Sequence, residues 1–245
     1  MKTENKRNIR PSLHVHSKCG LYKRFVKRLM DFTISAIAII VLCPVLLVVA
    51  VLVKIKLGSP VIFKQKRPGL NEKIFTLYKF RSMTDESDVN GNLQPDNVRL
   101  TKFGKLLRSI SFDELPELLN ILVGDISIVG PRPQLVQDIV FMTKEQRQRH
   151  SVLPGLTGWA QINGRNGITW EKKLALDLEY INDITFLGDW KIIFITVAKV
   201  FKRDGICAEG MDTAENFGDY LLREKKISED EYCVTLEQSK QLVKG

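Results

Sequence analysis

The chain has 245 residues, and its 44% hydrophobic content is enough for a sizeable core in one large or two small domains, which excludes a disordered protein. Its 37 basic and 28 acidic side chains give a net charge of +9, which suits nucleic acid, an anionic membrane surface or a phosphorylated ligand. The four cysteines form no Cys-x-x-Cys pair, so a disulfide framework and a zinc site are disfavoured and a reducing, cytoplasmic environment is expected.

Residues 1–21 are polar and basic and show no sustained periodicity, which predicts a basic flexible arm. The apolar run that follows is not succeeded by the small-residue cleavage site of a secretory signal. We therefore expect no part of this region to be removed.

Residues 32–53 contain no charged side chain and are about long enough to cross the hydrocarbon core of a bilayer. Basic clusters stand on both sides, and a crossing helix would place one of them on the side that basic residues avoid. We therefore expect residues 22–56 to form a re-entrant membrane helix that breaks at Cys43-Pro44, because proline removes a backbone hydrogen bond and bends a helix. A helix that crosses fully and a buried soluble helix are the alternatives. The flanking cations, which anionic lipid would attract, are Lys23, Arg24, Lys27 and Arg28 before the run and Lys54, Lys56, Lys64, Lys66 and Arg67 after it.

Two strand-like runs, residues 61–63 and 73–80, are joined through Pro68-Gly69, a pair typical of tight turns, and this pattern predicts a β-hairpin. Lys79 and Arg81 close the second strand and are candidate phosphate-binding cations. The run from 84 to 99 is too polar to pack, and we interpret it as a lid over a ligand.

Two adjacent carboxylates, Asp113 and Glu114, stand just before an apolar helix. A capping box formed by Ser111 and Glu114 is the simpler explanation. Pro116 argues against a helix start at Ser111, because proline lacks the amide hydrogen that the first turn would need, so we expect the start at Asp113 or Leu115. At such a start the helix dipole would keep Asp113 ionised beside a phosphorylated substrate.

Other residues suit the binding of phosphate, nucleotide or lipid. The prolines on both sides of Arg132 fix its backbone for a bidentate phosphate contact, although an ordinary rigid turn explains them equally well. Residues 152–166 are rich in glycine and amide side chains, which suits a base or a sugar, with Arg165 as a candidate contact. Residues 190–201 are apolar with lysines around them, which predicts either a helix at the membrane surface or core packing.

Together these pieces favour phosphoryl transfer at a membrane. Asp113 would be the nucleophile and would form an acyl phosphate, while Glu114 would act as a base or, with Asp113, as a ligand of Mg²⁺. The phosphates of the substrate would be neutralised by Arg108, Arg132, Lys79 and Arg81.

Several motifs in the chain resemble those of the bacterial sugar transferases, the monotopic polyprenol-phosphate phosphoglycosyl transferases. They are Lys79-Phe80-Arg81-Ser82-Met83, Leu107-Arg108 with Asp113-Glu114-Leu115-Pro116, Gly130-Pro131-Arg132-Pro133 and Pro154-Gly155-Leu156-Thr157-Gly158. The resemblance extends from about Tyr22 to Phe217. The chain departs from the family at Cys43-Pro44, where a Ser-Pro pair is usual.

The resemblance implies that a sugar 1-phosphate passes from a UDP-sugar to undecaprenyl phosphate with release of UMP, as the first membrane step of surface glycan or glycoprotein synthesis. It also implies a covalent phosphosugar on Asp113, Mg²⁺ at Glu114, and a monotopic protein at the bacterial inner membrane. Nucleic acid is not an expected partner. The oligomeric state stays open, with a homodimer among the options.

The fold expected from pattern and resemblance is α+β and mainly helical. A re-entrant membrane helix would join a cytoplasmic catalytic domain, residues 57–217, that holds the β-hairpin and interfacial amphipathic helices, and residues 218–245 would form a C-terminal extension of unknown role. Within the family, residues 67–75 and 170–173 resemble the small enzymes of bacterial N-linked glycosylation. The donor sugar would then resemble diacetylated bacillosamine, with another N-acetylated deoxysugar or a hexose still open.

Two rival functions remain at this stage. A membrane-tethered interaction module would use its cations to bind nucleic acid or lipid head groups and would release no product. A glycosyl transferase that moves the sugar without its phosphate would release UDP in place of UMP. The nucleotide released therefore separates the three hypotheses.

Overall fold

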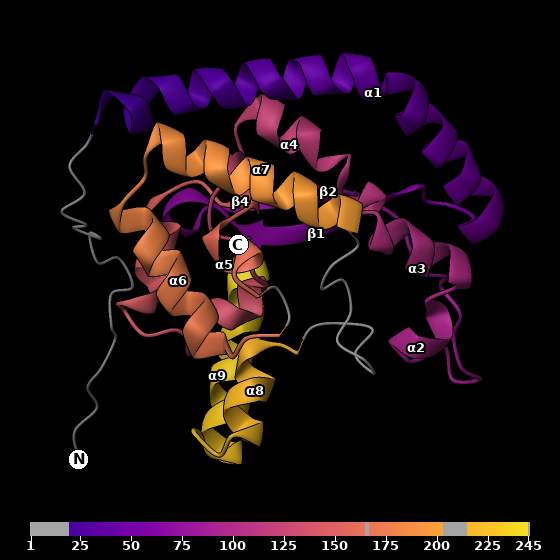
Figure 1. The fold of residues 1–245 in the computed structure, drawn as a ribbon. Coiled ribbons are helices and arrows are strands. Elements are labelled where there is room, and N and C mark those ends of the chain that lie inside the picture. The colour runs from indigo at the N-terminus through magenta and orange to yellow at the C-terminus, as the bar shows by residue number, and fades with distance from the viewer. Residues whose placement is uncertain (1–19, 165–166, 203–214, 245) are drawn as a thin grey trace.

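The structure of the chain, a computed structural model, describes residues 20–164, 167–202 and 215–244. In this part it is mainly helical with two two-stranded sheets, which confirms the α+β class. Figure 1 shows one long helix, α1 (Lys27–Leu57), lying along one side of the molecule, and the helices α8 (Phe217–Arg223) and α9 (Glu229–Lys244) at the opposite end. Nearly all of the expected basic arm, and Arg165, lie outside the described residues.

Helix α1 follows a π-helical turn, η1 (Tyr22–Val26), and continues through Pro44 without interruption. Its length and composition are sufficient to cross a membrane. In Figure 1 the helix bends along its course but does not break, and an internal proline is the usual cause of such a bend. The helix continues through Cys43-Pro44, so the break expected there does not interrupt α1, and a re-entrant path through a membrane stays a prediction.

One side of α1 packs against the rest of the chain along its whole length. Before Pro44, Ile34 and Ala38 pack on a core that includes Ile121, and after it Val49 and Val53 lie in a second core. The other side of the helix is apolar and exposed, which is typical of a surface that meets a membrane or another protein. Its exposed residues include Ile37, Ile40, Val41, Leu47, Val48, Val51 and Ile55.

Polar contacts fasten the N-terminal part of α1 to the domain below it. Arg28 donates to the carbonyl oxygens of Ile121 and Leu122 at 2.6 and 2.9 Å. Lys27 forms an ion pair of 2.5 Å with Asp189. Two of the four cations that precede the apolar run are thus committed to contacts within the protein, whereas the sequence led us to expect them at a lipid surface.

Two buried carboxylates complete this attachment. The carboxylate of Asp31 accepts from the Ser127 hydroxyl at 2.7 Å and from the Ile128 amide at 3.0 Å. Asp189, whose side chain is fully buried, accepts from Tyr22 at 2.6 Å and from Tyr180 at 2.8 Å, in addition to Lys27. We call Tyr22, Lys27, Asp31, Ser127, Tyr180 and Asp189 the anchor network.

The predicted hairpin is present. Strand β1 (Ile62–Pro68) pairs antiparallel with β2 (Ile74–Phe80) in the register Ile62 to Phe80, and a single 3₁₀ turn, η2 (Leu70–Glu72), joins them. The polar run that follows contains the short helix α2 (Asp96–Arg99). Its role as a lid stays a prediction.

The chain then forms the helix α3 (Lys102–Ser109), the 3₁₀ turn η3 (Phe112–Glu114) and the helix α4 (Glu117–Val123). Strand β3 (Ser127–Val129) pairs parallel with β4 (Gly155–Thr157). A Cβ atom on Gly155 would lie 2.1 Å from the Gly130 nitrogen, so the two backbones can approach only because both residues are glycine. This close packing gives part of the glycine-rich run a structural purpose, where we had expected a base or sugar site.

Helix α7 (Phe186–Lys202) carries apolar side chains on both its buried and its exposed sides: Ile192 is buried in the core, while Leu187 and Phe194 are exposed. The core packing expected as one alternative for this segment is therefore present, and a position at the membrane surface stays a prediction. The other short elements are η4 (Val136–Phe141), η5 (Gln146–Ser151), α5 (Trp159–Ile162) and α6 (Trp170–Asn182).

The C-terminal helices pack on η4. Tyr232 stacks on Phe141 with ring centroids 5.7 Å apart, and the Phe217 amide donates to Asp138 at 2.9 Å. The domain boundary that we placed after Phe217 therefore falls within α8. Phe217, the first residue of α8, is part of the domain core.

Candidate active site

The two adjacent carboxylates do not lie on an α-helix. Ser111 adopts a left-handed conformation with φ of +57°, and its side chain makes no capping hydrogen bond in the structure described. Asp113 and Glu114 belong to the 3₁₀ turn η3, and α4 begins only at Glu117. Both the capping box and the helix start at Asp113 or Leu115 were therefore wrong. The reason is the one that raised doubt about Ser111: Pro116 cannot donate an amide hydrogen and so stands at the cap of α4.

Two cations converge on one oxygen of Glu114. Lys79, from β2, lies 2.8 Å from Glu114 Oε1, and Arg132, from the loop after β3, lies 2.5 Å from the same oxygen. Burial alone would raise the pKa of Glu114, but the charges of Arg132 and Lys79 outweigh it and hold that pKa well below its ordinary value. Glu114 is therefore ionised throughout the neutral range.

Asp113 differs from its neighbour. Its side chain is buried, and burial together with the negative charge of Glu114 raises its pKa to about 6, against the opposing charges of Lys79, Arg108 and Arg132. We had expected the start of a helix to keep Asp113 ionised. With this pKa Asp113 is mostly ionised at neutral pH, but it takes up a proton as the pH falls through about 6, a behaviour that is common for groups in functional sites.

A third carboxylate, Glu117, joins the site, although the sequence interpretation did not include it. Its Oε1 lies 3.0 Å from Lys79, so that Lys79 lies between Glu114 and Glu117. Burial raises the pKa of Glu117 to about 7, against the charge of Lys79. No motif in the sequence marked Glu117, because its pKa is raised by burial in the folded chain. We call Lys79, Asp113, Glu114, Glu117 and Arg132 the charged cluster.

Two arginines that the sequence interpretation did not assign to the site hold Arg132 in place. Arg149, in a buried ion pair of 2.7 Å with Asp177, donates to the Arg132 carbonyl oxygen at 2.7 Å. Arg67 donates to the carbonyl oxygen of Pro133 at 3.1 Å. The backbone around Arg132 is thus fixed by two guanidinium groups as well as by the flanking prolines. No sequence signal indicated these contacts, because the partners are far apart in the chain.

The remaining candidate cations have different places. Arg108, on α3, donates to the Ser82 hydroxyl at 2.9 Å, and its charge lowers the pKa of Asp113, so it lies near the cluster. Arg81 is buried and donates to the carbonyl oxygens of Met83 and Ser59 at 2.7 and 2.5 Å. The structure therefore brings Lys79, Arg108 and Arg132 together around the carboxylates and gives Arg81 contacts that brace the chain after β2.

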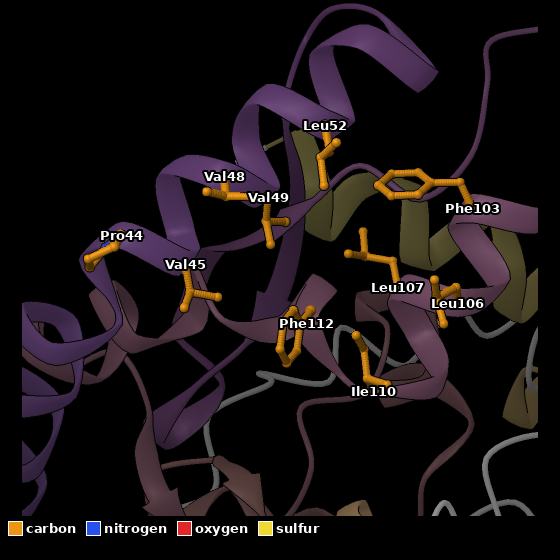
Figure 2. Close-up of a pocket in the computed structure, with 10 residues that line it drawn as sticks. All are labelled: Pro44, Val45, Val48, Val49, Leu52, Phe103, Leu106, Leu107, Ile110 and Phe112. Atoms are coloured by element: carbon orange, nitrogen blue, oxygen red, sulfur yellow. The ribbon is translucent and has the colours of Figure 1, made fainter.

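An apolar groove of about 380 Å³ lies between α1 and α3, beside η3. Figure 2 shows side chains of α1 on one side and those of α3 and Phe112 on the other. We call it the α1–α3 groove, and it is lined by Pro44, Val45, Val48, Val49, Leu52, Phe103, Leu106, Leu107, Ile110 and Phe112.

Within the described residues, no group of three or more His, Cys, Asp or Glu side chains is arranged to hold a metal ion. Mg²⁺ usually binds proteins through one or two carboxylates and completes its shell with waters and substrate phosphates. The adjacent carboxylates Asp113 and Glu114 fit that pattern, since both are oxygen ligands and Glu114 is ionised at neutral pH.

The chain matches the family model "Bacterial sugar transferase" over residues 22–203. The chain belongs to this family. It is 53% identical over 192 residues to "Uncharacterized sugar transferase EpsL" of Bacillus subtilis, a match that covers 78% of this chain and 95% of that protein. The family expectation is thereby confirmed. The suggested place beside the enzymes of N-linked glycosylation stays a prediction.

Two further relatives are named for their reactions. The "UDP-glucose:undecaprenyl-phosphate glucose-1-phosphate transferase" of Escherichia coli is 41% identical over 73% of this chain and 40% of its own length. The "UDP-N-acetylgalactosamine-undecaprenyl-phosphate N-acetylgalactosaminephosphotransferase" of Aeromonas hydrophila is 36% identical over 72% of this chain and 44% of its own length. The chain thus matches less than half of each of these longer relatives.

Proposed function

We propose that this protein transfers a sugar 1-phosphate from a UDP-sugar to undecaprenyl phosphate and releases UMP. The observation that carries the proposal is the charged cluster. In it the buried Asp113, whose pKa is raised to about 6, lies beside the ionised Glu114 and the two cations that contact Glu114. Membership of the bacterial sugar transferase family and the names of the relatives support the same reaction class.

The reaction would proceed in two displacements at phosphorus. In the first, a carboxylate oxygen of Asp113 attacks the phosphorus that carries the sugar, the bond from that phosphorus to the bridging oxygen breaks, and UMP leaves with the electron pair. In the second, an oxygen of undecaprenyl phosphate attacks the same phosphorus and the bond to Asp113 breaks. Asp113 is thereby regenerated, and the product is a lipid diphosphate sugar.

The surrounding side chains would stabilise the charge that develops. Arg132 and Lys79 are held in place before the substrate arrives, so little reorganisation is needed when negative charge accumulates on the leaving phosphate. Arg108 would favour the ionised form of Asp113, which is the nucleophilic one. Mg²⁺, held by Glu114 and Asp113, would neutralise the substrate phosphates when bound.

The exposed apolar side of α1 supports a place at the membrane, where the acceptor lipid resides. We propose the bacterial inner membrane, with the rest of the chain on the cytoplasmic side, where nucleotide sugars are made. The donor sugar stays open, since relatives are named for glucose and for N-acetylgalactosamine.

The decisive experiment incubates the purified protein with Mg²⁺, undecaprenyl phosphate and a panel of UDP-sugars, and identifies the nucleotide released. UMP is expected with at least one donor. Mass spectrometry after incubation with that donor alone should find a phosphosugar on the peptide that contains Asp113. Release of UDP, or release of no nucleotide from any donor, would contradict the proposal.

A further inference from the structure

We infer that the α1–α3 groove binds the polyprenyl chain of the acceptor lipid and places its phosphate at Asp113. The inference rests on the proposed function and adds to it the site at which the second substrate is held. It is carried by the lining of the groove, by its position relative to the charged cluster, and by its opening.

The groove is lined by apolar side chains alone. They come from α1, from α3 and from the turn that carries Asp113, and none of the lining residues bears a polar side chain. A ligand with hydrogen-bonding groups along its length would leave those groups unsatisfied there, which is costly. An isoprenoid chain has no such groups, so the lining suits it.

Two residues that line the groove are chain neighbours of residues at the candidate active site. Phe112 lines the groove, and the next residue in the same 3₁₀ turn is Asp113. Leu107 also lines it, and its neighbour on α3 is Arg108, whose positive charge acts on Asp113. The adjoining environments, one apolar and one cationic, match a ligand that has a hydrocarbon chain and an anionic head.

The outer side of the groove is open to the surroundings. Val48 is 58% exposed, Leu106 50% and Leu52 39%, and Val48 belongs to the exposed apolar side of α1. A chain that lies in the groove can therefore continue along the surface that we assign to the bilayer. An engineered protein cavity of about 150 Å³ holds benzene, and by that ratio about 380 Å³ holds roughly fifteen carbon atoms, or three isoprene units.

The test separates the two half-reactions of the full-length protein. Val48→Trp fills the groove and should raise the KM for undecaprenyl phosphate about tenfold or more, because several methylene contacts are lost. UMP release with donor alone should be unchanged, because that step does not use the acceptor. Val51→Trp is the matched control, since Val51 is 57% exposed on the same helix and does not line the groove.

A series of acceptors measures the length of chain that the groove holds. With the unmodified protein, KM should fall from a one-isoprene phosphate to farnesyl phosphate, which has three isoprene units, and change little beyond it. This dependence should weaken in Val48→Trp and persist in Val51→Trp. Equal effects of the two substitutions, or no dependence on chain length, would overturn the inference.

Binding of a different molecule in the α1–α3 groove would give a different experimental result. A photoreactive farnesyl phosphate should label peptides that contain Val45 or Phe112, and unlabelled farnesyl phosphate should displace it. Displacement by phosphatidylglycerol instead would identify a bilayer lipid, and a change of oligomeric state in Val48→Trp would identify a second copy of the chain. Either result would overturn the inference. Failure of the unmodified protein to release UMP from donor alone would instead refute the proposed function itself.

Discussion

The anchor network and the charged cluster both bring carboxylates together with hydrogen-bond donors or cations, yet their charges are satisfied to very different degrees. In the anchor network, Asp189 accepts from Tyr22, Lys27 and Tyr180, and Asp31 accepts from a hydroxyl and an amide. Each carboxylate there has complementary donors.

In the charged cluster, carboxylates compete for cations. Glu114 takes both Lys79 and Arg132, and within the described part of the chain Glu117 Oε1 has no hydrogen bond of good geometry. The pKa values of Asp113 and Glu117 are raised, Asp113 by burial and by the charge of Glu114. Buried polar networks whose charges and hydrogen bonds are fully satisfied make a fold rigid. Networks with unsatisfied groups and shifted pKa values are typical of functional sites. The difference indicates that the first network holds α1 in place, and it supports the proposal that the second serves a substrate.

Asp113→Asn should give the largest effect. It removes the nucleophile and leaves the size of the side chain unchanged, so the rate of UMP release should fall by about 10⁴-fold or more. Because burial penalises the charge of Asp113, the variant should melt at a temperature equal to or above that of the unmodified protein at pH 8. Nucleotide release and thermal melting check the two parts. Activity within tenfold of normal would refute the assigned role.

Asp189→Asn should show the opposite behaviour: it should lower stability and leave the pH dependence of the reaction unchanged. It leaves the buried Lys27 ammonium without its counter-charge, so we expect the free energy of unfolding to fall by about 3 kcal/mol or more, while the folded protein keeps its pH profile. Denaturant unfolding in detergent checks this. Asp183→Asn, at an exposed position, is the control and should change stability by less than about 0.5 kcal/mol. Equal stability of the two variants would contradict the anchoring role.

Arg108→Gln should shift the pH dependence. The reacting form of Asp113 is ionised, so the rate of the donor half-reaction should rise with pH through about 6. The charge of Arg108 lowers the pKa of Asp113, so its removal should raise that pKa and move the profile up by about one pH unit. Single-turnover rates between pH 5 and 8 measure the shift. Lys102→Gln, on the same helix and exposed, should leave the profile in place.

The features that the sequence could predict are those that depend on residues close together in the chain. The charge-free run indicated α1, and Pro68-Gly69 indicated the hairpin. The adjacency of Asp113 and Glu114 indicated a charged site, and the chemistry assigned to it stays a prediction. These signals depend on local conformation and composition, which a chain expresses before tertiary contacts decide anything.

The parts that could not be predicted depend on tertiary contacts. Arg149 reaches the Arg132 carbonyl, and Asp31 reaches Ser127 across 96 positions in the chain. The capping box, by contrast, could be doubted from the sequence because Pro116 cannot donate an amide hydrogen, although the left-handed conformation of Ser111 could not be predicted. Glu117 was missed because its position, and not its motif, raises its pKa to about 7.

Glu117→Gln should give the smallest effect and tests whether competition within the charged cluster matters. Burial raises the pKa of Glu117 to about 7, so Glu117 becomes ionised as pH rises from 6 to 8 and then competes with a substrate phosphate for Lys79. In the unmodified protein the KM for the donor should therefore rise over this range, by about twofold to fivefold, as expected for one partly screened ion pair. Glutamine cannot ionise, so the variant should show a flat KM and should bind the donor better at pH 8 but not at pH 6. Glu117→Asp, which keeps the charge, should retain the rise, and a flat KM in the unmodified protein would show that Lys79 is not shared between Glu117 and the substrate.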